Sequence, residues 1–213
     1  MNFAKLQAAL IALGLFIAAY APAFLAVALI RPPVEGAVPL IIAISLAIAL
    51  AAIVLLARRD GGMSAFGFSL PRFRYVGLAI LIGLPLAATA GALSHAFPSR
   101  GPIDTSTLRP WMLWLYFGLG ASIQEEVIFR GLIQSFLEQR WAPAVPLSRT
   151  SVSAAVVFTA ILFGAVHLDS GIVVAAAAVV LGLVAGELRR RSGSLLPAMI
   201  VHALFNAPSL LWP

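Results

Sequence analysis

Long apolar stretches separated by short polar breaks run along the whole chain. Seven stretches can cross the roughly 30 Å hydrocarbon core of a bilayer, for which a helix needs about 20 apolar residues. They lie at about 7–30, 37–57, 75–97, 111–137, 151–168, 171–188 and 194–212. The pattern predicts an all-α fold, a polytopic bundle of transmembrane helices with about seven spans, or eight if a re-entrant segment is added.

The breaks between these stretches carry residues that end helices. They contain proline, glycine or clustered arginine, at Arg31-Pro32-Pro33, Arg58-Arg59-Asp60-Gly61-Gly62, 98–102, Ala142-Pro143 with Pro146, and Arg189-Arg190-Arg191-Ser192-Gly193. The connection Asp169-Ser170-Gly171 is very short and predicts a tight antiparallel pair of helices. No long linker interrupts the pattern, so residues 1–213 are predicted to form a single integral membrane domain.

Composition supports a membrane protein. Of 213 residues, 62% are hydrophobic and 10% are charged, whereas soluble domains carry about a quarter charged residues. The net charge of +6 could suggest a nucleic acid partner, but the arginines lie in short connections between apolar runs. That placement is typical of membrane topology, so no nucleic acid is predicted. The absence of cysteine excludes disulfides and thiolate chemistry.

Lysine and arginine are distributed unequally between the two predicted sides of the membrane. One side holds ten of them, Lys5, Arg58, Arg59, Arg72, Arg74, Arg140, Arg149, Arg189, Arg190 and Arg191. The other side holds three, Arg31, Arg100 and Arg109. Because positive loops stay in the cytoplasm, we expect a cytoplasmic amino terminus and an external carboxyl terminus. The expected location is the cytoplasmic membrane of a prokaryote.

Charged residues lie inside the fourth apolar stretch. An ionised side chain at mid-bilayer costs about 2.5–3.5 kcal/mol on insertion scales. Glu126 and Arg130 are four residues apart and share a helix face, whereas Glu125 is rotated by about 100°. The spacing predicts that Arg130 neutralises one carboxylate while the other points elsewhere. The alternatives are a wholly structural ion-pair network or a segment that lies in the membrane interface.

Two further pairs lie at helical spacing in later stretches. Phe163 and His167 are four residues apart, and so are His202 and Asn206. Taken alone, His167 also fits a capping or interfacial residue, and the second pair fits a hydrogen bond between helices. The remaining histidine, His95, has no polar companion at this spacing and is interpreted as structural or interfacial.

Together these residues predict a polar pocket between three spans of an apolar protein, which is the usual form of a functional site. A buried glutamate suits a general base, a histidine can share its proton, and His and Asn can donate to an oxyanion. The chemistry that fits is attack of water on a peptide carbonyl. Nucleophile motifs such as GxSxG and the zinc motif HExxH are absent. Zinc held by Glu125, His167 and His202 stays an open alternative.

The three motifs, in this order, resemble the CAAX protease and bacteriocin-processing family, which includes the type II CAAX prenyl endopeptidases. They are Glu-Glu-xxx-Arg at Glu125, Glu126 and Arg130, Phe-xxx-His at Phe163 and His167, and His-xxx-Asn at His202 and Asn206. The resemblance covers a protease-like core at about 111–210; the first three spans match only in being hydrophobic.

The resemblance implies an intramembrane endopeptidase in which Glu125 activates water with His167 as its partner. His202 and Asn206 would then hold the oxyanion, while Glu126 and Arg130 support the site. It implies a glutamic-type mechanism without a cofactor, and substrates that are membrane-associated proteins or peptides, cut near a C-terminus or a membrane anchor. Prokaryotic family members also process peptides, confer bacteriocin self-immunity or cut anchors of surface proteins.

Other functions compete with this expectation. A non-proteolytic immunity or binding protein could share the scaffold, and a transporter or proton relay also buries Glu and His. A pseudo-protease is expected to lose a motif residue, and a transporter to show an internal repeat; the chain shows neither feature. The expected depths of the carboxylates, His167 and His202 place the site in the middle to outer half of the membrane, which favours an extracytoplasmic cleavage point.

Overall fold

The computed structural model describes residues 3–97, 106–141 and 153–211, and all regular structure within them is helical. In chain order the first elements are α1 (Phe3–Ile30), α2 (Val34–Ala57), the 3₁₀ turn η1 (Met63–Phe66) and α3 (Phe73–Ala96). A continuous helical column follows, made of α4 (Pro110–Leu113), η2 (Trp114–Gly120), α5 (Ala121–Glu126), η3 (Val127–Gln134) and α6 (Ser135–Glu138). The last elements are α7 (Ala154–Ala165), the 3₁₀ turn η4 (Leu168–Ser170), α8 (Ile172–Ser192) and α9 (Leu196–Leu211).

The predicted all-α membrane bundle is confirmed. Helices α1, α2, α3 and α8 are each long and apolar enough to cross a membrane, by length and composition. Helices α7 and α9 are apolar but shorter. The predicted fourth span corresponds to the column α4–α6, in which η2 and η3 are π-helical.

The fifth span, predicted at 151–168, is shorter than expected. Helix α7 has 12 residues, which at 1.5 Å per residue extend about 18 Å and do not cross a 30 Å core. The helix stops because the His167 ring bonds to the Phe163 carbonyl, which the His167 backbone N–H would bond to in a continuing α-helix. That N–H donates to the Gly164 carbonyl instead. Residues 151–152, and the predicted breaks at 98–102 and 142–146, lie outside the described residues.

The predicted break at Arg189–Gly193 begins later than expected. Helix α8 continues through the three arginines to Ser192, and Gly193 follows in the left-handed conformation with φ 72°. Arginine is a good helix former and is favourable near a helix carboxyl end, whereas a left-handed glycine is a common helix stop. The sixth span therefore ends at the glycine and not at the first arginine.

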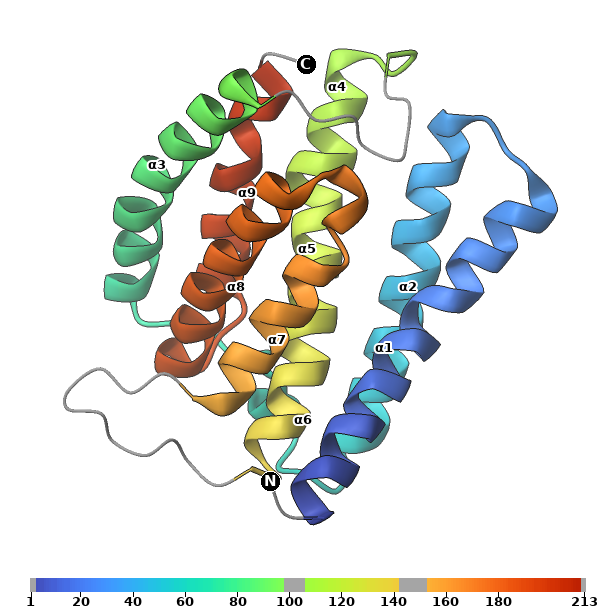
Figure 1. Ribbon diagram of the computed structural model, residues 1–213. Helices are drawn as coiled ribbons and strands as arrows, with labels where there is room; N and C mark the ends of the chain where they lie inside the picture. Colours follow the sequence, from blue (N-terminus) through green and yellow to red (C-terminus); the bar gives the residue numbers. More distant parts are fainter. Residues whose placement is uncertain (1–2, 98–105, 142–152, 212–213) are drawn as a thin grey trace.

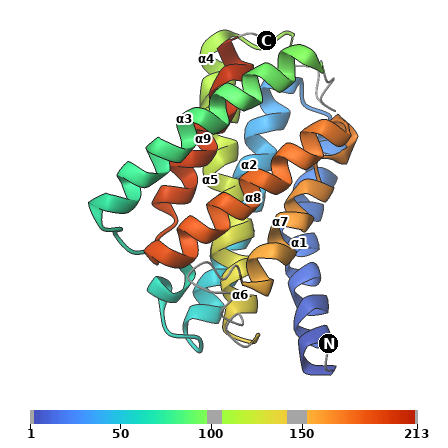
Figure 2. The same ribbon diagram turned by 60° about the vertical axis from the view of Figure 1, so that its left-hand side comes forward.

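The column α4–α6 passes through the middle of the bundle, with the α1–α2 pair on one side and α3 with α9 on the other (Figures 1 and 2). Helix α3 packs against α9, and α7 against α8. Every residue from Glu126 to Leu137 is buried, while α1, α2 and α3 present exposed leucine, isoleucine and phenylalanine outward. The charged part of the column is thereby shielded from lipid by the surrounding helices.

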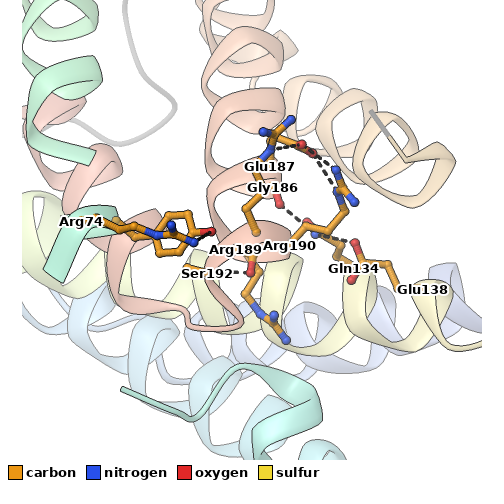
Figure 3. A network of polar contacts seen from close by, with 10 residues as sticks. Arg74, Gln134, Glu138, Gly186, Glu187, Arg189, Arg190 and Ser192 are labelled. Atoms are coloured by element: carbon orange, nitrogen blue, oxygen red, sulfur yellow. Dashed lines mark hydrogen bonds and ion pairs between the residues drawn. The ribbon is translucent and has the colours of Figure 1, made fainter. Parts of the chain in front are cut away.

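A polar network ties the carboxyl end of α8 to the column (Figure 3). Gln134 Nε2 donates to the Gly186 carbonyl and to Glu138, each at 3.0 Å. Buried Arg189 donates to Ser135 Oγ at 3.0 Å and to the Ala65 carbonyl at 2.9 Å. These contacts fix the arginine-rich end of the bundle.

Candidate active site

The helix turn that carries both glutamates lies between two irregular segments. Helix α5 is only six residues long and is flanked by the π-helical η2 and η3. π-helical residues are well under 1% of protein structure and often occur at functional sites. Within this turn Glu126 is fully buried, whereas 19% of the Glu125 side chain is exposed. The two carboxylates therefore have different surroundings.

Glu126 lies between a cation and an imidazole. Its Oε1 atom is 3.1 Å from Arg130 Nη1 and 2.8 Å from His202 Nδ1, and all three side chains are buried. The ion pair expected from the four-residue spacing is present. A carboxylate only accepts hydrogen bonds, so His202 donates to Glu126 through Nδ1. The other ring nitrogen, Nε2, lies on the side of the ring away from Glu126. Nε2 lies 3.6 Å from Glu125 Oε2, outside direct hydrogen-bond distance.

Phe163 packs among the charged and imidazole side chains. The Arg130 guanidinium carbon lies 4.6 Å from the centre of the Phe163 ring, a cation–π distance. The same ring meets His202 edge-on at 5.6 Å and lies 4.7 Å from the His167 ring. Phe163 is buried and so fixes the relative positions of three site residues.

His167 lies just past the end of α7, at the start of η4. Its backbone, with φ −103° and ψ 6°, is in the sparsely populated bridge region where many active-site residues are found. Its Nδ1 atom is 2.7 Å from the Phe163 carbonyl oxygen. Because a carbonyl only accepts, Nδ1 carries a proton, and in the neutral ring Nε2 is then an acceptor.

Asn206 on α9 contacts the column from the same side as His202. Its Nδ2 atom donates to the Phe117 carbonyl at 3.0 Å and to Ser122 Oγ at 3.4 Å. Buried Ser122 donates in turn to the Gly118 carbonyl at 2.8 Å. Sequence reasoning missed Ser122, although its position four residues before Glu126 places it on the Glu126–Arg130 face.

A cavity of about 220 Å³ lies beside these residues. Phe163, His167, His202 and Asn206 line it, together with apolar side chains of α3 and α8. Glu125 is not part of the lining; its contact is with His202. The structure thus brings His167, His202 and Asn206 to one cavity, with Glu125 behind His202. His95 is exposed and lies outside the lining.

No three His, Cys, Asp or Glu side chains within the described part of the chain are arranged to hold a metal ion. One nitrogen of each relevant imidazole is already engaged, by Glu126 and by the Phe163 carbonyl. A histidine that ligates a metal commonly donates its other ring N–H in this way, so zinc held by Glu125, His167 and His202 stays a prediction.

These observations define an integral membrane helical bundle with a buried site of carboxylates, imidazoles and an amide beside a cavity. Residues 107–208 match the family model described as type II CAAX prenyl endopeptidase Rce1-like, so this segment is similar to that protease family. The match confirms the resemblance drawn from the three motifs, all of which lie inside it. No curated protein and no solved structure matches the chain.

Proposed function

We propose that the protein is an intramembrane endopeptidase that hydrolyses a peptide bond near the C-terminus or membrane anchor of a membrane-associated protein. The observation that carries the proposal is the position of His202, which contacts both carboxylates and also lines the cavity with His167 and Asn206. The match of residues 107–208 to the model of a protease family supports the same reaction class.

In the proposed mechanism Glu125 is the general base. Arg130 lies against Glu126, so Glu125 is the carboxylate without that cation and can accept a proton from water. The resulting hydroxide adds to the peptide carbonyl carbon and forms a tetrahedral oxyanion. His167 Nε2, the acceptor atom of the neutral ring, shares the proton with Glu125. When the C–N bond breaks, that proton goes to the leaving amine.

His202 and Asn206 are the proposed oxyanion donors. Glu126 accepts the hydrogen bond from His202 Nδ1 and so orients the ring, whose Nε2 atom can donate to an oxyanion when it carries a proton. The 3.0 Å bond from Asn206 to Phe117 holds the amide in place. The long 3.4 Å contact with Ser122 is weak, so the N–H group that makes it can donate to an oxyanion instead at small cost.

The position of the cavity supports cleavage on the extracytoplasmic side. Its lining includes Phe97 just after α3, Ser170 at the end of η4 and Val173 at the start of α8. The three arginines lie at the opposite end of α8, and the positive-inside rule assigns that end to the cytoplasm. The proposed topology is a cytoplasmic amino terminus in a prokaryotic cytoplasmic membrane, with the site in the middle to outer half.

Activity on peptides tests the proposal. The wild-type protein, purified in detergent, is offered C-terminally anchored and prenylated peptides and is compared with Glu125→Gln, His167→Ala and the off-site control His95→Ala. Loss of a general base or its partner is expected to lower kcat about 10²–10⁴-fold, whereas His95→Ala cleaves like the wild type. Cleavage that survives both site substitutions would show the mechanism to be wrong.

Two further outcomes separate the alternatives. Activity that persists after strong chelation supports the metal-free reaction, whereas activity lost on chelation and restored by Zn²⁺ favours the zinc version. Histidines, and carboxyl groups whose pKa is raised by burial, titrate between about pH 5 and 9. If peptides bind but are not cut at any pH in this range, the result favours the non-proteolytic binding or immunity function.

A further inference from the structure

A buried polar contact joins α2 to the turn that carries the two glutamates. Gln124 Nε2 donates to Ser45 Oγ at 2.9 Å. Ser45 is 0% exposed and Gln124 is 3% exposed. The Ser45 hydroxyl gives its own hydrogen to the Ile41 carbonyl at 2.5 Å, so its oxygen is the acceptor for Gln124. In this contact Gln124 on α5 is therefore the donor and Ser45 on α2 the acceptor.

The contact is specific in an otherwise apolar surface. Ser45 is the only polar side chain of α2 between Val38 and Ala57. Leaving a buried amide without a partner costs about 1–3 kcal/mol, so Gln124 favours the rotation of α5 that brings it to Ser45. An apolar neighbour would not select one rotation in this way.

The rotation of α5 determines where the two carboxylates point. Successive helix residues differ by about 100° in direction, so when Gln124 faces α2, Glu125 and Glu126 face away from it. On that side they meet His202 of α9 at 3.6 and 2.8 Å. The π-helical turns before and after α5 break the regular hydrogen-bond ladder, which leaves contacts across helices to fix this six-residue turn.

Helix α1 adds aromatic contacts in the same region. The rings of Phe16 and Tyr20 lie 5.7 and 6.4 Å from Phe129, whose ring meets Phe163 edge-on at 4.9 Å. Tyr20 also lies close enough to Gln124 and Glu125 to interact with both. The α1–α2 pair thus contacts the carboxylate turn directly and the Phe163 cluster through one intermediate ring.

We infer that Ser45 and Gln124 are positioning residues for Glu125, and that the α1–α2 pair holds the catalytic turn in its working rotation. Both α1 and α2 lie outside the family-matched residues 107–208, so the match assigns them no part in the site. The kinetic consequence of this inference rests on the proposed function. The structural consequence, that α5 is anchored to α2, is independent of the proposed function.

The test compares Ser45→Ala, the double variant Ser45→Ala/Gln124→Leu, and Thr159→Val. Thr159 is also a buried helix hydroxyl, and the bonds recorded for it go to carbonyls of its own helix at Ala155 and Val156. It therefore serves as a matched control. Kinetics on a cleaved peptide, thermal unfolding in detergent and hydrogen exchange of residues 114–134 are measured for each variant.

Ser45→Ala is expected to lower kcat about 10- to 100-fold with KM within about threefold, because misplacement by about 1 Å can cost about 10²-fold in rate. Exchange of 114–134 is expected to become faster, with α7 and α8 unchanged. The double variant removes both polar partners, so its unfolding temperature returns towards wild type while kcat stays low. Thr159→Val keeps its kcat.

The inference is overturned by a Ser45→Ala kcat that stays close to that of the wild type, or by a double variant that recovers kcat together with stability. Unchanged exchange of 114–134 in Ser45→Ala also overturns it. The exchange measurement needs no substrate, so a wild-type protein that cuts no peptide defeats the proposed function alone. The exchange rates then decide whether the anchor exists.

Discussion

Two neighbouring glutamates of the same turn have unlike surroundings. Glu126 is buried with a guanidinium on one side and an imidazole on the other. Glu125 is partly exposed, and the nearest nitrogen of the His202 imidazole lies 3.6 Å from its Oε2 atom. The cation and the donor hold the Glu126 carboxylate in place, whereas the partly exposed Glu125 is the carboxylate that can meet water. Their different environments separate the supporting role from the reacting one.

The buried pair predicts an asymmetric response to mutation. Arg130→Met leaves Glu126 buried without its cation, which is expected to cost about 3–5 kcal/mol of stability. Replacing both partners, in Glu126→Gln/Arg130→Met, removes the uncompensated charge and is expected to restore most of that loss. Thermal unfolding in detergent measures both variants.

Peptidase assays on the same variants separate stability from function. The double variant is expected to stay inactive, because the amide that replaces the Glu126 carboxylate accepts the hydrogen bond from His202 Nδ1 more weakly and orients the ring less well. An active double variant would mean that Glu126 and Arg130 serve only as a structural pair. A stable Arg130→Met single variant would contradict the buried-charge argument itself.

Residue contacts within one helix could be predicted from the sequence, and contacts between helices could not. The four-residue spacing is enough to pair Glu126 with Arg130. The contact of His202 with both carboxylates depends on how α9 crosses α5, which hydropathy does not encode. The family resemblance implied that Glu125 is partnered with His167, whereas the ion-pair contact that the structure records for Glu125 is with His202. The roles of these residues stay predictions.

At the scale of elements, the α7–α8 pair determines the position of His167. The two helices approach closely because small residues face each other: a Cβ atom added at Gly182 would lie 2.8 Å from the Ala160 Cα atom. On α7, a Cβ added at Gly164 would lie 2.8 Å from the Ala175 carbonyl oxygen. Close packing of this kind is typical of helices in lipid.

Gly182→Ala is therefore expected to push α7 and α8 apart, because the obstructing atoms belong to the backbone and cannot rotate away. Overpacking of this kind costs about 1–3 kcal/mol. The η4 turn carries His167 with it, so peptidase activity is expected to fall by about tenfold or more, as misplacement of a catalytic group does. Unfolding temperature and kcat measure the two effects.

Gly77→Ala is the matched control. A Cβ atom added at Gly77 in α3 meets nothing within 4 Å, and alanine is favoured over glycine in a helix by about 1 kcal/mol. We expect unchanged activity and equal or higher stability. Wild-type behaviour of Gly182→Ala would show that the α7–α8 contact is loose and does not hold His167.

The positions of the helices could be predicted from hydropathy because lipid imposes long apolar runs. The hydrogen-bond pattern inside the helices and the residues at which they end could not be predicted in this way. Nothing in the apolar pattern distinguishes i→i+5 bonds from i→i+4 bonds, so η2 and η3 were not expected. The end of α7 is set by a side chain that takes the Phe163 carbonyl, a local competition that the count of apolar residues does not contain. Likewise Arg189–Arg191 predicted a break but extend α8.

At the scale of the whole molecule, the bundle has two unlike ends. The end that contains η1 and the last turn of α8 holds the polar network around Gln134 and Arg189 (Figure 3). The cavity lies towards the other end, where α7 turns into α8 at η4. Composition was enough to predict the bundle, and the positive-inside rule predicts its direction. Neither contains the information that the polar residues gather around the α4–α6 column.

This difference between the ends leads to a prediction of sidedness. The chain has no cysteine, so single cysteines can be introduced without background. Leu168→Cys lies in the exposed η4 turn and Ala121→Cys lies at the start of α5; Arg59→Cys, at the arginine-rich end, is the control. With intact cells, a membrane-impermeant maleimide is expected to label position 168, and position 121 if it labels at all, but not 59. Inverted vesicles are expected to give the reverse. Labelling of 168 and 121 only from the cytoplasmic side would place the cavity on the cytosolic face and would direct the search for substrates to cytosolic tails.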